Sequence, residues 1–81
     1  MITGAQVRAA KALLGWSGSI LADRAGIAIS TIRRVEACDG VLETASVKVL
    51  QAIQSALEVG GVEFIGTPED RPGVRFNTGP K

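Results

Sequence analysis

A single glycine between two short apolar helical patterns, in the stretch ILADRAGIAISTIRRVEA of residues 20–37, constrains this chain more than any other feature. Gly26 supplies a backbone conformation that most residues avoid, so it ends one helix and forces a turn before the next. Ala22 falls where the two helices would cross, and a bulky side chain there would push them apart. The residues whose spacing predicts an inward direction are Leu21, Ala22, Ala25, Ile27, Ile32 and Val35.

The segments around this unit predict where its helices begin and end. Thr3 followed by Gln6 is a capping-box start for a first helix, which carries apolar residues at helical spacing (Val7, Ala10 and Leu14) and stops at Gly15. Ser17 is expected to cap a second helix that runs to about Ala25. A third helix is expected from about Ala28 to Ala37, followed by a turn at Asp39-Gly40.

A fourth helix is expected to be capped by Thr44 and to end at Gly60-Gly61. It carries two apolar stripes, one formed by Val47, Leu50, Ile53 and Leu57 and the other by Val49, Ala52, Ala56 and Val59. One stripe is enough to pack on a small domain. The second therefore predicts contact with another subunit.

After Gly61 the apolar residues no longer recur at helical spacing but alternate with other residues. VEFI and GVRF are short alternating segments separated by the turn-forming stretch GTPEDRP, which predicts a two-stranded hairpin. A hairpin is barely stable alone, so it should lean on a helix or on a second copy of itself. Residues 77–81 are expected to fray. We thus expect a mainly α fold of four to five helices in residues 1–61 and a short β extension in residues 62–81, which we expect to serve dimerisation.

Composition limits the class of protein. The chain has 81 residues, a formal net charge of +1, no His and one Cys, which predicts one small domain, no internal disulfide and no zinc site of paired ligands. The N-terminal residues lack the order of a signal peptide and no apolar run could span a membrane, so a cytoplasmic protein is expected. No catalytic constellation or phosphate loop is present, which predicts that the protein is not an enzyme and needs no metal or cofactor.

The turn at Gly26 and its flanking helices fit a helix-turn-helix, whose second helix can lie in the major groove of DNA. If residues 27, 32 and 35 point inward, the third helix presents to solvent Ile29, Ser30, Arg33, Arg34 and Ala37. Arg34 can contact guanine with two hydrogen bonds, Arg33 can contact a phosphate, and Ile29 can pack on a thymine methyl. Trp16 is expected to cover the first two helices.

The stretch LADRAGIAISTIRRVEACDG, with RAAKALLGWS before it, resembles the core of the Cro/cI-type (Xre-like) helix-turn-helix family of bacterial and phage regulators. The resemblance covers about residues 3–58, and GVEFIGTPEDRPGVRF resembles the C-terminal extension of small members. It implies a lambda-repressor-like DNA-binding domain in a transcriptional regulator that binds a palindromic operator as a homodimer.

Carried over residue by residue, the resemblance implies a phosphate contact at the start of the second helix and base contacts from the third helix, with an ion pair between Lys11 and Glu36. The DNA-contacting residues that the resemblance implies are Ser17, Gly18, Ser19, Ala28, Ile29, Ser30, Thr31, Arg33 and Arg34. Lys48, near the start of the fourth helix, is a further candidate, either as a phosphate contact or as a solvated lysine. Arg33 and Arg34 could also form a merely solvated helix face.

A second function remains open on the same scaffold. The near-neutral charge and the expected exposure of Ile29 also suit a protein-interaction module, such as an antiactivator or antitoxin-like partner of another regulatory protein. Arg33 and Arg34 favour DNA. The salt dependence of duplex binding separates the two functions, because only phosphate contacts give a steep slope.

Overall fold

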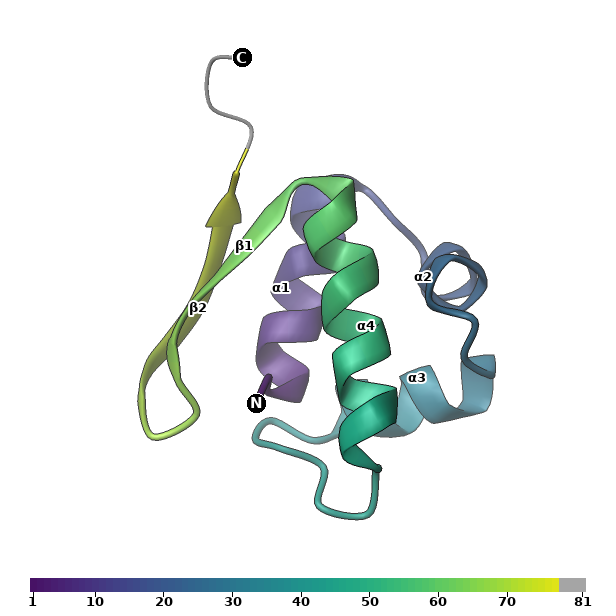
Figure 1. Ribbon diagram of the computed structural model, residues 1–81, viewed down its shortest axis with the longest axis horizontal. Coiled ribbons are helices and arrows are strands. Elements are labelled where there is room, and N and C mark those ends of the chain that lie inside the picture. The colour runs from purple at the N-terminus through teal and green to yellow at the C-terminus, as the bar shows by residue number, and fades with distance from the viewer. Residues whose placement is uncertain (78–81) are drawn as a thin grey trace.

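The computed structural model describes residues 1–77, which form four helices followed by a two-stranded antiparallel hairpin (Figure 1). The elements are α1 (Gly4–Leu14), α2 (Gly18–Ala25), α3 (Ile29–Ala37), α4 (Val47–Gly60), β1 (Val62–Thr67) and β2 (Asp70–Phe76). The predicted mainly helical fold with a C-terminal hairpin is thereby confirmed. No helix in the described part of the chain is long and apolar enough to cross a membrane.

The ends of the first two helices follow the predicted signals. The Thr3 hydroxyl accepts a hydrogen bond from the Gln6 backbone N–H while the Gln6 side chain accepts one from the Thr3 N–H, which completes the capping box. Gly15 closes α1 in the left-handed conformation, at φ +67°. Ser17 caps α2, and its hydroxyl accepts from the N–H of Ile20.

The predicted start of the fourth helix is wrong by two residues. Ser46, not Thr44, caps α4, and its hydroxyl accepts a hydrogen bond from the N–H of Val49. Thr44 instead lies in a turn that is closed by the bond from the Ala45 N–H to the Leu42 carbonyl, at 3.1 Å. Leu42 and Ala45 both pack against the core. The turn lets both make these contacts, so the helix begins only after it.

The core lies where α1 and α4 stand side by side, with the hairpin on one flank and α2 and α3 on the other (Figure 1). Its largest fully buried apolar side chains are Val7, Leu21, Ile32, Val35, Leu50, Ile53, Leu57 and Val62. The first predicted stripe of α4 faces this core, except that Val47 at its start is 52% exposed. The second stripe is divided, because Ala56 is buried whereas Val59 is 86% exposed.

The hairpin packs against α1 and against the end of α4. A helix was one of the two supports predicted for it. Val62, Phe64 and Val74 pack against the core, and the amide of Gln6 donates to the carbonyl oxygens of Ile65 (3.3 Å) and Gly73 (2.9 Å). The strands extend farther into the predicted loop than expected, which leaves a turn at residues 68–69.

The end of β2 is anchored to the start of β1. The N–H of Asn77 donates to the Gly61 carbonyl at 2.7 Å, so the expected fraying does not include this residue, and residues 78–81 lie outside the described part. On the exposed face of the hairpin, Arg75 donates two hydrogen bonds to the carboxylate of Glu63. These bonds lower the pKa of Glu63 below its usual value.

Candidate nucleic-acid interface

The turn between α2 and α3 sets the position of the candidate interface. Gly26 adopts the left-handed conformation, at φ +68°, and the N–H of Ile27 donates to the Ala22 carbonyl at 3.0 Å. Leu21 and Ile32 are fully buried on the two sides of the turn. Of the other residues predicted to point inward, Ala22 and Val35 are buried and Ala25 and Ile27 are half-buried. The turn therefore packs the two helices as the sequence predicted.

The exposed side of α3 matches the prediction in all but one residue. Ser30, Arg33, Arg34 and Ala37 are exposed. Ile29, predicted to face outward, is half-buried and packs against the core. Its Cδ1 atom lies 3.8 Å from where a Cβ at position 18 would be. Ile29 therefore leans toward the start of α2, where even a Cβ at position 18 would make only ordinary van der Waals contact with it, and this packing explains the difference.

An open hollow lies between the first turn of α2 and the exposed side of α3. Its lining brings together residues from three helices and the cap of α2, namely Lys11, Ser17, Gly18, Ser19, Ile29, Arg33, Glu36 and Ala37. Five of the ten predicted DNA-contacting residues thus share one concave surface. The other five are Ala28, Ser30, Thr31, Arg34 and Lys48, and they lie outside the hollow.

The floor of the hollow carries the predicted ion pair. The Lys11 ammonium lies 2.8 Å from the Glu36 carboxylate, and the two side chains are only 17% and 15% exposed, so the prediction is confirmed. This pairing offsets the charge of Lys11. Arg33 takes part in no ion pair within residues 1–77, so its guanidinium supplies the uncompensated positive charge at the hollow.

The first turn of α2 adds hydrogen-bond donors to this surface. The N–H groups of a first helical turn have no intrahelical acceptor. The Ser17 hydroxyl satisfies the N–H of Ile20, which leaves those of Gly18 and Ser19 for a ligand. The macrodipole of α2 favours a negative charge at the same place. Donors, dipole and the Arg33 charge together suit an anion such as a phosphate.

The start of α3 is also open to a ligand. Ala28 is its N-cap residue, and it makes no side-chain bond to the first turn. Ser30 is exposed beside it and Thr31 is half-buried. The N–H groups of Ile29 and Ser30 therefore have no intrahelical or side-chain acceptor.

Arg34 and Lys48 lie away from the hollow. The Arg34 guanidinium donates to the hydroxyl of Thr44 at 3.1 Å, in the turn before α4. Lys48 is exposed in the first turn of α4. The adjacent arginines of α3 therefore have different surroundings, since Arg33 lines the hollow and Arg34 contacts the turn.

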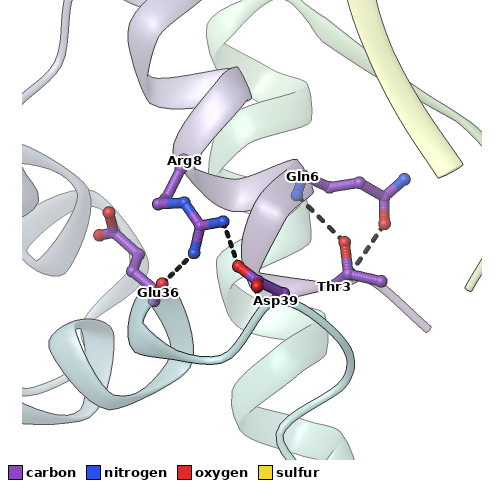
Figure 2. Close-up of polar contacts among 5 residues, drawn as sticks. All are labelled: Thr3, Gln6, Arg8, Glu36 and Asp39. Atoms are coloured by element: carbon purple, nitrogen blue, oxygen red, sulfur yellow. Dashed lines mark hydrogen bonds and ion pairs between the residues drawn. The ribbon is translucent and has the colours of Figure 1, made fainter.

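Polar contacts between α1 and the end of α3 form a joint that holds α3 in place. The sequence did not predict it. Figure 2 shows Arg8 of α1 between two groups at the end of α3. Its guanidinium donates to the backbone carbonyl of Glu36, and it lies 2.6 Å from the carboxylate of Asp39. Gly4 lies so close to this end that a Cβ there would overlap the carbonyl oxygens of Val35 and Cys38. The only sequence signal for this joint is the glycine at the first position of a helix.

A second surface lies between α2 and α4. It is a mainly apolar groove lined by Arg24, Ala25, Ala52, Ser55, Ala56 and Val59. Arg24 also stacks over the ring of Trp16, 5.1 Å from its centre. Trp16 is half-buried against the end of α4, where a Cβ at Gly60 would lie 2.8 Å from the ring. Trp16 therefore covers the core near α4, as well as lying between the first two helices.

Residues 1–77 contain no group of three or more His, Cys, Asp and Glu side chains that could hold a metal ion. Cys38 is a half-buried free thiol at the end of α3. No protein-family model, curated protein or solved structure matches the chain.

Proposed function

We propose that this protein is a sequence-specific DNA-binding transcriptional regulator of the Cro/cI-like kind, in which α2 and α3 form a helix-turn-helix and α3 enters the major groove. The observation that carries the proposal is the hollow beside α3, where the first turn of α2 and Arg33 line one concave surface. Backbone N–H groups at a helix N-terminus and an arginine are a common pair of ligands for a DNA phosphate.

Base contacts are assigned to the part of α3 outside the hollow and at its edge. Ser30 and Arg34 are exposed there, four positions apart in the sequence, so they share one side of the helix. Arg34 can donate to O6 and N7 of guanine, and Ile29 can contact a thymine methyl at the rim of the hollow. Ala28 and Thr31 flank these contacts, and Lys48 is assigned a further phosphate.

The regulator is proposed to act as a homodimer on a palindromic operator. In support, the groove between α2 and α4 is mainly apolar, and Val59 beside it is 86% exposed. Such a surface gains stability when a second subunit removes it from water. Two copies of α3 would then lie about 34 Å apart, one turn of DNA.

The test is selection of duplex DNA from a random pool by the purified protein, followed by measurement of affinity for the enriched sequence. The proposal predicts a palindromic sequence that binds at least about a thousandfold tighter than random duplex. The control is the double variant Arg33→Ala, Arg34→Ala, which should enrich nothing. If the parent also enriches no sequence, the proposal is wrong.

A second candidate function is a protein-interaction module on the same fold. The specific observation in its favour is again the apolar groove with Val59, which suits a different protein as well as a second copy. This function predicts association with another regulatory protein that is insensitive to salt, whereas duplex binding weakens steeply as salt rises.

A further inference from the structure

Thr44 and Arg34 are joined across the junction of α3 and the turn that follows it, with 3.1 Å between the Arg34 Nη2 atom and the Thr44 Oγ1 atom. We propose that Thr44 is a positioning residue that holds the Arg34 guanidinium ready for its base. This proposal rests on the proposed function, because the base contact of Arg34 is part of it.

The position of Thr44 is fixed by its neighbours. The residues on either side of the turn, Leu42 and Ala45, pack against the core, and their backbones are joined at 3.1 Å. The hydroxyl of Ser46, not that of Thr44, caps α4. The Thr44 hydroxyl therefore stands on a turn that is closed by a backbone hydrogen bond and anchored by core contacts on both sides. It has no capping role, so it can accept from Arg34.

The chemistry of this partner leaves Arg34 able to bind DNA. Of the ion pairs in residues 1–77, none includes Arg34, so its charge is not neutralised by a carboxylate. A guanidinium has five N–H donors, and the bond to Thr44 uses one. A neutral hydroxyl thus restricts the direction of the side chain while the remaining donors stay available for guanine.

Restriction before binding raises affinity, because the free protein has already lost the rotamer freedom that a mobile arginine would lose on contact. The contribution of one such side chain corresponds to about two- to tenfold in affinity. Arg33 serves as an internal comparison, since its side chain lines the hollow and should not respond to changes at Thr44.

The test compares Thr44→Val, which removes the hydroxyl but keeps the shape, with Thr44→Ser, which keeps the hydroxyl. On the duplex enriched by the parent, Thr44→Val should lose about two- to tenfold in affinity. The loss should be absent on duplexes in which the base pair at which Arg34→Ala relaxes discrimination has been replaced. Thr44→Ser should bind like the parent. Thr44→Val should add nothing in an Arg34→Ala background.

A second measurement without DNA separates this proposal from the proposed function. Nitrogen-15 relaxation of the arginine Nε groups should show Arg34 ordered in the parent and in Thr44→Ser, and mobile in Thr44→Val. A parent that binds duplex specifically but has equally mobile Arg34 in all three proteins would overturn the positioning role alone. An ordered Arg34 in a parent that binds no duplex would instead overturn the DNA-binding function, and the positioning role with it.

Discussion

Lys11 of α1 and Glu36 of α3 form an ion pair at 2.8 Å, with side chains 17% and 15% exposed, and so tie the first helix to the helix that we assign to the major groove. Glu36→Gln leaves Lys11 without its charged partner in a poorly hydrated place. We expect it to lower the free energy of unfolding by about 1–3 kcal/mol, between the values for surface and buried pairs.

Urea denaturation measures this loss, and the exposed pair of Glu63 and Arg75 provides the matched control. Glu63→Gln removes the same kind of charge from a solvated pair, so its effect should be much smaller. Equal midpoints for the Glu36→Gln variant and the parent would show that the pair contributes no stability.

The joint between α1 and α3 predicts a strong effect at Gly4. Gly4→Ala places a Cβ against the backbone carbonyls of Val35 and Cys38, and backbone atoms cannot move away as a flexible side chain can. We expect a loss of at least about 1–3 kcal/mol in the free energy of unfolding, as for overpacked cores.

Gly40→Ala is the control for this change, because nothing lies within 4 Å of a Cβ at position 40. It should leave stability nearly unchanged in the same urea titration. An equally small effect of Gly4→Ala would mean that α1 does not approach α3 as closely as described.

The sequence predicted the features that depend on local signals. Helix caps at Thr3 and Ser17 and the turn at Gly26 each depend on residues within a few positions of one another, and all three are present. The pair of Lys11 and Glu36 was predicted through the family resemblance, and the structure confirms it.

Features that depend on tertiary packing were not predictable. The choice between Thr44 and Ser46 as the cap of α4 depends on how Leu42 and Ala45 reach the core. The contact between Arg8 and Asp39 joins residues 31 positions apart. Ile29 was assigned to the exposed side from helical periodicity alone, which cannot show that its side chain packs toward the start of α2 and against the core.

The proposed homodimer predicts a specific effect at Val59, which is 86% exposed beside the apolar groove. Val59→Glu should convert the dimer to a monomer, because a charge at an apolar interface must lose its hydration. Val47→Glu is the control, at another exposed valine on α4 that does not line the groove.

Light scattering at tens of micromolar protein checks the dimer. We expect twice the chain mass for the parent and the Val47→Glu variant, and the mass of one chain for the Val59→Glu variant. A parent with the mass of one chain would contradict the dimer itself.

Ile29 predicts a preference for thymine. Each thymine of the selected duplex is replaced in turn by uracil, which lacks the methyl group. Burial of one methyl is worth about 0.8 kcal/mol, so the parent should lose roughly fourfold in affinity at one position of each half-site. Ile29→Ala should be indifferent at that position. A parent that tolerates uracil throughout, or an Ile29→Ala variant that stays sensitive, would remove Ile29 from base contact.

The central claim is that Arg33 and the first turn of α2 bind a DNA phosphate while Arg34 contacts a base. The most direct test is the slope of log affinity against log salt concentration for selected and random duplexes, measured for the parent, Arg33→Ala and Arg34→Ala. We expect a steep slope for the parent, reduced by about one in Arg33→Ala on both duplexes. Arg34→Ala should weaken the selected duplex by about 1–3 kcal/mol more than the random one. A parent that binds neither duplex at low salt, or two variants with identical effects on both duplexes, would contradict it.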